Sequence, residues 1–180
     1  MSDSRGAVIW LTGLPGAGKA TIARAVHAVL VARGVPTELL EGAEVRESLS
    51  RGLGFSPEDR DEHVRRIGFV AKLLSRNGVV AICAAVSPQR AARDEVRQHV
   101  TNFIEVFVDG STPAADPGMA YEPPTAPEVH VRPAAQSVPD AIDAVLAALE
   151  QRGILAAWRD ARREAQEAEI RRRLAALGYR

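Results

Sequence analysis

Short apolar runs alternate along the chain with longer segments in which apolar residues recur every three or four positions. Two of the runs, Ala7–Thr12 and Val79–Val86, are apolar at nearly every position, which is typical of strands covered on both faces of a parallel sheet. Between them, residues 19–32 place their apolar side chains on one helical face. This alternation predicts an α/β domain with a mainly parallel, doubly wound sheet and flanking helices.

Helix caps and chain breakers predict the remaining elements. Ser56-Pro57 combines a capping serine with a proline in the first helical turn, and Asn77-Gly78 is a typical helix end. Residues 110–127 are rich in Gly, Pro, Ala and Ser, so we expect an irregular loop there. The other expected strands are 37–40, 103–108 and 128–131, and the other expected helices are 44–50, 57–76, 87–100, 138–151 and 154–177.

Composition and charge exclude several classes of protein. The 180 residues contain 23 basic and 23 acidic side chains, and this balance argues against a general nucleic-acid or membrane-surface binder. No apolar run approaches the ~20 residues of a membrane helix, and the only cysteine is Cys83, which excludes a disulfide framework. The four histidines show no metal-binding spacing. We expect a cytoplasmic protein.

The segment Gly13-Leu14-Pro15-Gly16-Ala17-Gly18-Lys19-Ala20 follows the first expected strand and opens the first helix. It fits the phosphate-loop pattern except at its last position. Glycines let backbone N–H groups turn toward phosphate oxygens, and Lys19 would reach the β- and γ-phosphates. Ala20 lacks the hydroxyl that normally holds Mg²⁺, so Mg²⁺ is a weaker expectation than ATP. The residues expected to hold the ATP phosphates are Gly13, Gly16, Ala17, Gly18, Lys19, Ala20 and Thr21.

Several further stretches resemble the adenylylsulfate (APS) kinase family. They are VIWLTGLPGAGKATIA at the phosphate loop, LGFSPEDR from Leu53, RRIG from Arg65, VSP from Val86, and YEPP and APE around residues 121–128. The resemblance covers about residues 6–150 and implies a phosphate-loop kinase fold. We expect this domain to span residues 1–153 and to be followed by a helical extension at 154–180. The resemblance also implies a homodimer that uses ATP to phosphorylate the 3′-hydroxyl of APS.

Carried over by residue, the resemblance implies a pocket for APS. Paired arginines can hold the oxygens of a sulfate–phosphate anhydride through their fork geometry, and Phe55 can stack on adenine. The residues implied in this pocket are Arg46, Phe55, Arg60, His63, Val86 and Ser87. His63 and Gln89 replace the asparagine and tyrosine usual in the family.

The chain departs from the family pattern where the chemistry takes place. The expected D-G-D-x-x-R motif reads Glu41-Gly42-Ala43-Glu44-Val45-Arg46, so Ala43 replaces the aspartate expected to accept the substrate proton. Glu41 is the remaining candidate for a catalytic carboxylate, together with Lys19 on the phosphates. The lid that the family carries before its YExP segment is shortened here, within residues 110–127. Two functions therefore stay open: a kinase with impaired or altered activity, or a nucleotide- or partner-binding module without phosphate transfer.

Overall fold

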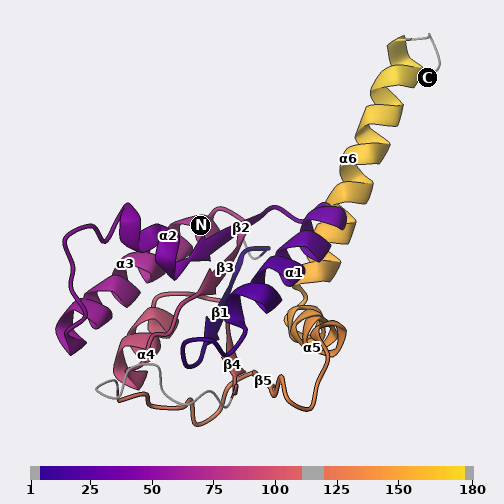
Figure 1. Cartoon of the computed structure of the whole chain (residues 1–180). Helices are drawn as coiled ribbons and strands as arrows, with labels where there is room; N and C mark the ends of the chain where they lie inside the picture. Colours follow the sequence, from indigo (N-terminus) through magenta and orange to yellow (C-terminus); the bar gives the residue numbers. More distant parts are fainter. Residues whose placement is uncertain (1–4, 111–119, 177–180) are drawn as a thin grey trace.

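The computed structural model describes residues 5–110 and 120–176 of the chain, and it contains a single parallel five-stranded sheet (Figure 1). The strand order is β2-β3-β1-β4-β5, which confirms the predicted α/β phosphate-loop architecture. The strands are β1 (Ala7–Thr12), β2 (Thr37–Glu41), β3 (Val80–Ala84), β4 (Phe103–Val108) and β5 (Val129–Val131). The helices are α1 (Lys19–Ala32), α2 (Gly42–Glu47), α3 (Pro57–Arg76), α4 (Arg90–Gln98), α5 (Val138–Gln151) and α6 (Ile154–Ala176).

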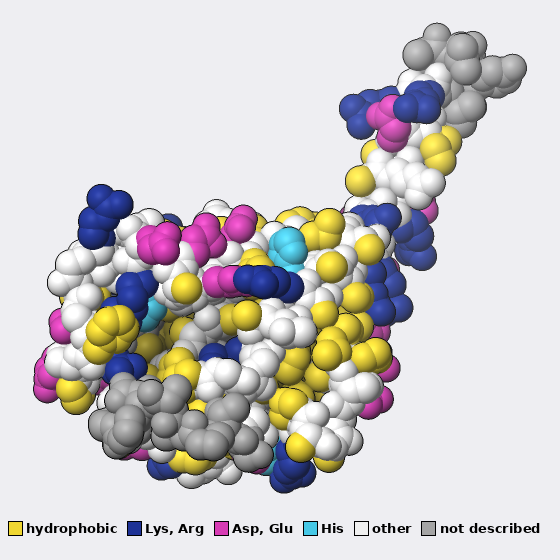
Figure 2. Space-filling view, in the orientation of Figure 1, with side chains coloured by type: hydrophobic (Ala, Val, Ile, Leu, Met, Phe, Trp, Pro, Cys, Tyr) yellow, Lys and Arg dark blue, Asp and Glu magenta, His cyan; other side chains and the backbone are white. Residues whose placement is uncertain are grey.

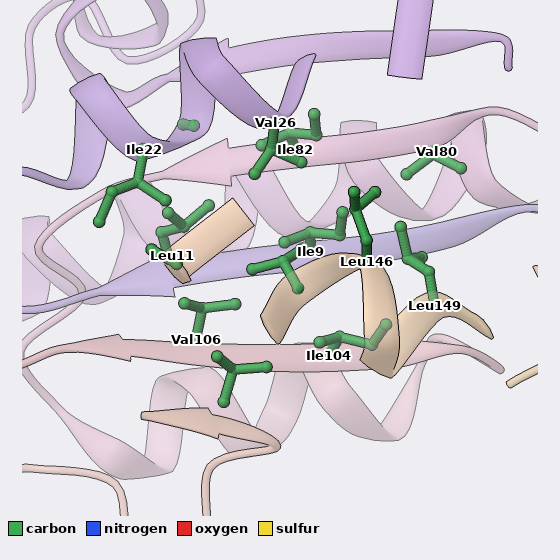
Figure 3. Close-up of a cluster of buried hydrophobic side chains, with 14 of the residues drawn as sticks. Ile9, Leu11, Ile22, Val26, Val80, Ile82, Ile104, Val106, Leu146 and Leu149 are labelled. Atoms are coloured by element: carbon green, nitrogen blue, oxygen red, sulfur yellow. The ribbon is translucent and has the colours of Figure 1, made fainter. Parts of the chain in front are cut away.

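The core is divided by the sheet into two layers. Along β1, alternate side chains point to opposite faces, so Ile9 and Leu11 belong to one buried cluster while Val8 and Trp10 belong to the other. The first cluster packs the sheet against α1 and α5 (Figure 3). It also includes Ile154 and Leu155 at the start of α6. The second packs it against α2, α3 and α4. Burial on both faces explains why β3 is apolar throughout and β1 is apolar at every position except Thr12.

Two of the predicted helices have boundaries that were wrong. The helix expected from residue 87 begins at Arg90, because Ser87 has a positive φ of 42° and Gln89 is extended. The helix expected at 44–50 instead begins at Gly42, directly after β2, and ends at Glu47. In the loop expected at 110–127, residues 111–119 lie outside the described part of the chain, and 120–127 carry no helix or strand.

Helix α6 begins on the body of the protein and then projects away from it (Figure 1). Ile154 and Leu155 are buried, and the Trp158 indole donates a hydrogen bond to the carbonyl of Arg5 at 3.1 Å. Farther along, basic and acidic side chains gather on the projecting part, with smaller hydrophobic groups between them (Figure 2). Ion pairs within the helix include Arg173 with Glu169 at 2.8 Å. Within residues 5–110 and 120–176, no helix combines the length and hydropathy needed to cross a bilayer.

Deleting α6 by truncation after Gly153 is expected to destabilise the fold by about 3 kcal/mol or more. The truncation removes two buried aliphatic side chains and the half-buried Trp158, each worth about 1.5–3 kcal/mol when fully buried. Urea unfolding of the two proteins measures the difference. Truncation after Ala165 is the control, because it removes exposed helix beyond these contacts. An unchanged midpoint after the longer deletion would show that α6 contributes nothing to stability.

Candidate active site

The phosphate loop (residues 13–21) joins β1 to α1 at the carboxyl edge of the sheet. A Cβ at Gly13 would lie 2.3 Å from the carbonyl oxygen of Val108, so only glycine lets the loop pass β4 this closely. Gly18 caps α1 with a φ of 97°, a conformation that suits glycine. The seven residues predicted to hold phosphates lie on the loop after β1 and on the first turn of α1, where backbone donors and the helix dipole favour an anion.

Lys19 folds back over this loop. Its Nζ donates hydrogen bonds to the carbonyls of Gly13 at 2.9 Å and Leu14 at 2.8 Å. Burial lowers the pKa of the ammonium to about 8, because the charged form loses hydration. A phosphate in the loop would supply a negative charge and stabilise the protonated form.

A cavity of about 340 Å³, which we call the acceptor cavity, opens beside Lys19. The space-filling view shows this hollow between α3 and the phosphate loop (Figure 2). All six residues predicted to bind the acceptor line it: Arg46, Phe55, Arg60, His63, Val86 and Ser87. Gly42, Ala43, Val64, Ala84, Ala85 and Pro88 complete the lining.

Two arginines flank the Phe55 ring at the mouth of this cavity. The guanidinium carbon of Arg46 lies 4.7 Å from the ring centroid, and that of Arg60 lies 5.5 Å from it. Each arginine also donates to a nearby carbonyl, Arg46 to Gly54 and Arg60 to Phe55 itself, both at 2.9 Å. Burial and the neighbouring Arg60 lower the pKa of Arg46. An anion between the two guanidiniums would relieve their repulsion.

His63 lies deeper in the cavity and is uncharged at neutral pH. Its Nδ1 lies 2.8 Å from the hydroxyl of Ser50. Burial first, and then the positive charge of Arg46, lower its pKa to about 4. The side chain therefore contributes a polar, neutral surface to the cavity and adds no charge.

Ser87 adopts the only positive φ among the described non-glycine residues. Its hydroxyl accepts a hydrogen bond from the Trp10 indole at 2.9 Å and donates to the carbonyl of Ala85 at 3.2 Å. The Thr12 hydroxyl donates to the neighbouring carbonyl of Val86 at 2.7 Å. These contacts hold the cavity wall in a conformation that costs of order 1 kcal/mol or more.

The Glu41 carboxylate is paired with an arginine that does not line the acceptor cavity. Both of its carboxylate oxygens accept hydrogen bonds from Arg24 on α1, at 2.6 and 2.7 Å. Ala43, where the family motif has an aspartate, lines the cavity with a methyl group. No carboxylate is among the described residues that line the acceptor cavity. In this structure, the Glu41 carboxylate could accept a proton from a substrate only after its ion pair with Arg24 breaks.

The residues present do not match the ligand set of a protein-held Mg²⁺. Ala20 supplies no oxygen, and the Glu41 carboxylate is occupied by Arg24. Across the described ranges, no group of three or more His, Cys, Asp or Glu side chains is placed to hold a metal ion.

A second cavity, of about 140 Å³, lies on the other side of the phosphate loop between α1, β5 and α5. Its lining is mostly apolar, as in sites for flat ligands such as a purine ring. The residues that line it are Gly18, Thr21, Ile22, Val131, Pro133, Gln136, Ser137, Val138 and Ala141. Sequence reasoning did not single out those beyond the loop, because the 133–138 turn carries no motif of its own.

Comparison with known proteins decides the family. A model of the adenylylsulphate kinase family matches residues 5–117. An adenylyl-sulfate kinase of Synechococcus sp. (strain JA-2-3B'a(2-13)) is 46% identical over 170 residues, which cover 83% of this chain and 97% of the relative. This chain belongs to the adenylylsulphate kinase family.

Solved structures of the family agree with the fold. The Mycobacterium tuberculosis APS kinase CysC in complex with AMPPNP and APS matches with a TM-score of 0.73 and 31% identity. That match covers 81% of this chain and 98% of the other. The hexameric APS kinase from Thiobacillus denitrificans matches with a TM-score of 0.70 and 39% identity over 84% of this chain and 30% of its own.

The alignment with the Synechococcus kinase contains gaps on the side of this chain. The alignment runs over 170 residues, yet it takes in only 83% of the 180 residues here, which is about 149. About 20 positions of the relative therefore have no counterpart in this chain.

Proposed function

We propose that the chain binds ATP or ADP on its phosphate loop and APS in the acceptor cavity, and that it phosphorylates APS to PAPS slowly. One observation carries the proposal: a single acceptor cavity is lined both by Lys19 of the phosphate loop and by the Arg46–Phe55–Arg60 group. This arrangement offers cations to a transferred phosphate and to an acceptor anion in one continuous space.

In this proposal, the second cavity takes the adenine ring of ATP and the phosphate loop takes its phosphates. Arg46 and Arg60 leave the face of Phe55 and grip the sulfate–phosphate group of APS, which frees the ring to stack on adenine. Phosphoryl transfer depends on positioning and on stabilising the transferred group. These two requirements are met by Lys19 and the backbone donors of the loop.

Slow turnover follows from the missing proton acceptor. The loss of a general base costs about 10²–10⁴-fold in rate, and no carboxylate is found among the described lining residues of the cavity. Glu41 is the nearest substitute by sequence, once released from Arg24. We place most of the roughly 20 positions that lack a counterpart in the lid region, within 110–127, where a shortened lid would leave the reaction less protected from water.

The lack of a carboxylate among the described lining residues favours a second candidate function, a nucleotide- or partner-binding module that transfers no phosphate. In either case we propose a cytoplasmic homodimer whose main domain spans residues 1–153. The helical extension at 154–180 follows that domain, and neither nucleic acid nor a membrane is a partner.

The deciding experiment incubates the purified chain with ATP, Mg²⁺ and APS and follows both ADP and PAPS. We expect PAPS at a rate well below the ~1–100 s⁻¹ usual for kinases. Calorimetry with ATP should show binding that depends little on Mg²⁺, because Ala20 offers no metal ligand. Binding of both nucleotides without any PAPS would support the module instead. No binding of ATP, ADP or APS would refute the kinase and the nucleotide-binding module, and only a partner-binding module would remain.

A further inference from the structure

Arg93 on α4 is a cation buried inside the fold, with 1% of its surface exposed. Each nitrogen of its guanidinium reaches a different segment. Nε donates to the carboxylate of Glu105 on β4 at 2.8 Å, one terminal nitrogen donates to the carbonyl of Ser87 at 2.6 Å, and the other donates to the carbonyl of Glu122 at 2.7 Å. The side chain therefore links the sheet, the wall of the acceptor cavity and the segment that begins at residue 120.

The linked segments also meet the start of the phosphate loop. The hydroxyl groups of Tyr121 and Thr12 lie 3.0 Å apart. Because the Thr12 hydroxyl gives its proton to the carbonyl of Val86 at 2.7 Å, Tyr121 is the donor in that pair. Thr12 is the last residue of β1 and directly precedes Gly13. A closed ring of hydrogen bonds thus runs from Arg93 through the cavity wall to the phosphate loop.

The main feature that needs this support is the backbone at Ser87. A non-glycine residue at a positive φ persists only where its surroundings hold it. The Ser87 carbonyl is held by Arg93, and its hydroxyl is held by Trp10. Burying a guanidinium is costly, and apolar replacements are often as stable. A role in holding a particular geometry explains its presence better than a role in stability.

We infer that Arg93 is a positioning residue, which fixes the Ser87–Pro88 wall of the acceptor cavity relative to the phosphate loop and thereby sets the affinity for the acceptor nucleotide. This inference rests on the proposed function, because it takes APS as the ligand of the cavity. Arg93 is not among the residues that line the cavity, so it acts through Ser87 and Tyr121.

The test compares Arg93→Gln with Arg97→Gln. Arg97 belongs to the same ionic network, where it contacts Glu105 and Glu128, but it touches neither Ser87 nor Glu122 in the described contacts. Calorimetry gives the Kd for APS and for ADP. We expect Arg93→Gln to weaken APS binding about tenfold while ADP binding changes less than about threefold. Arg97→Gln should leave both nearly unchanged.

A fluorescence measurement without ligand tests this inference independently of the proposed function. The chain has two tryptophans, so in a Trp158→Phe background the fluorescence reports Trp10, which contacts Ser87. We expect a shift of Trp10 emission in Arg93→Gln and none in Arg97→Gln. If the parent chain does not bind APS, the proposed function fails, and the Trp10 signal still decides whether Arg93 holds the wall.

Two results would overturn the inference. The first is that Arg93→Gln has the same Trp10 emission and the same APS affinity as the parent chain. The other is an equal loss of APS and ADP binding accompanied by a lower melting temperature, which would indicate a purely structural role. Should Arg93→Gln not fold, Tyr121→Phe removes the hydroxyl contact with Thr12 and leaves Arg93 in place. We expect Tyr121→Phe to weaken APS binding about twofold to threefold. An unchanged affinity would refute the claim that this ring of hydrogen bonds positions the cavity wall.

Discussion

Replacing Lys19 with methionine is expected to weaken ATP binding about 100-fold. The ammonium group is the only lysine nitrogen at the phosphate loop, where it already lies within hydrogen-bond distance of two loop carbonyls. Loss of one partner of a buried charge pair costs about 2–5 kcal/mol, and about 2.7 kcal/mol corresponds to 100-fold. Methionine keeps the length and apolar character of the side chain. Calorimetry with ATP at pH 7 measures the effect.

Lys72 provides a matched control, since it is the only other lysine of the chain and lies on α3, outside the phosphate loop. Lys72→Met should bind ATP as the parent does. A fall in affinity of less than about threefold in Lys19→Met would contradict the assignment of the phosphate site to this loop.

The lowered pKa of Lys19 predicts that the affinity for ATP depends on pH. Because the pKa of Lys19 is about 8 in the free protein, the ammonium loses its proton as the pH rises through 8, and ATP binding must then take up a proton. Affinity should therefore fall between pH 7 and pH 9 in the parent chain. Lys19→Met should show no such fall, because it carries no titrating group at this position.

Replacing Ala43 with aspartate is expected to raise the rate of PAPS formation about 100-fold. Ala43 lines the acceptor cavity beside Gly42 at the start of α2, where an acidic side chain also suits the helix dipole. The new carboxylate would accept the proton of the attacking hydroxyl, a contribution of about 10²–10⁴-fold for a general base. The assay measures PAPS at saturating ATP and APS.

Ala43→Asn is the matched control, because it has nearly the same shape and accepts no proton at neutral pH. It should leave turnover near that of the parent. If Asp and Asn give equal rates, the missing carboxylate does not limit the reaction. Glu41→Gln in the parent chain would then show whether Glu41 already supplies the base.

Local sequence determined much of the fold and of the phosphate site. The apolar β1, the glycine-rich turn and the amphipathic α1 are consecutive in the chain, so their geometry depends on neighbouring residues and was predictable. The Ser56 cap, which accepts from the backbone of Asp59 at 3.1 Å, likewise placed the start of α3. Phe55 and Arg60 were identified through a resemblance carried by the contiguous LGFSPEDR segment, and Arg46 through the contiguous EGAEVR segment that ends on α2.

Only the tertiary structure decided how distant residues pair. Glu41 is a free carboxylate in the sequence, but β2 and α1 bring it against Arg24, 17 positions away. Arg93 is one arginine among three on α4, and its burial against Ser87, Glu105 and Glu122 follows from the packing of that helix on the sheet. Such pairings depend on contacts between strands, helices and loops that the sequence separates. Burial and long-range hydrogen bonds therefore select the residues that hold the acceptor cavity in place, and no local pattern distinguishes them beforehand.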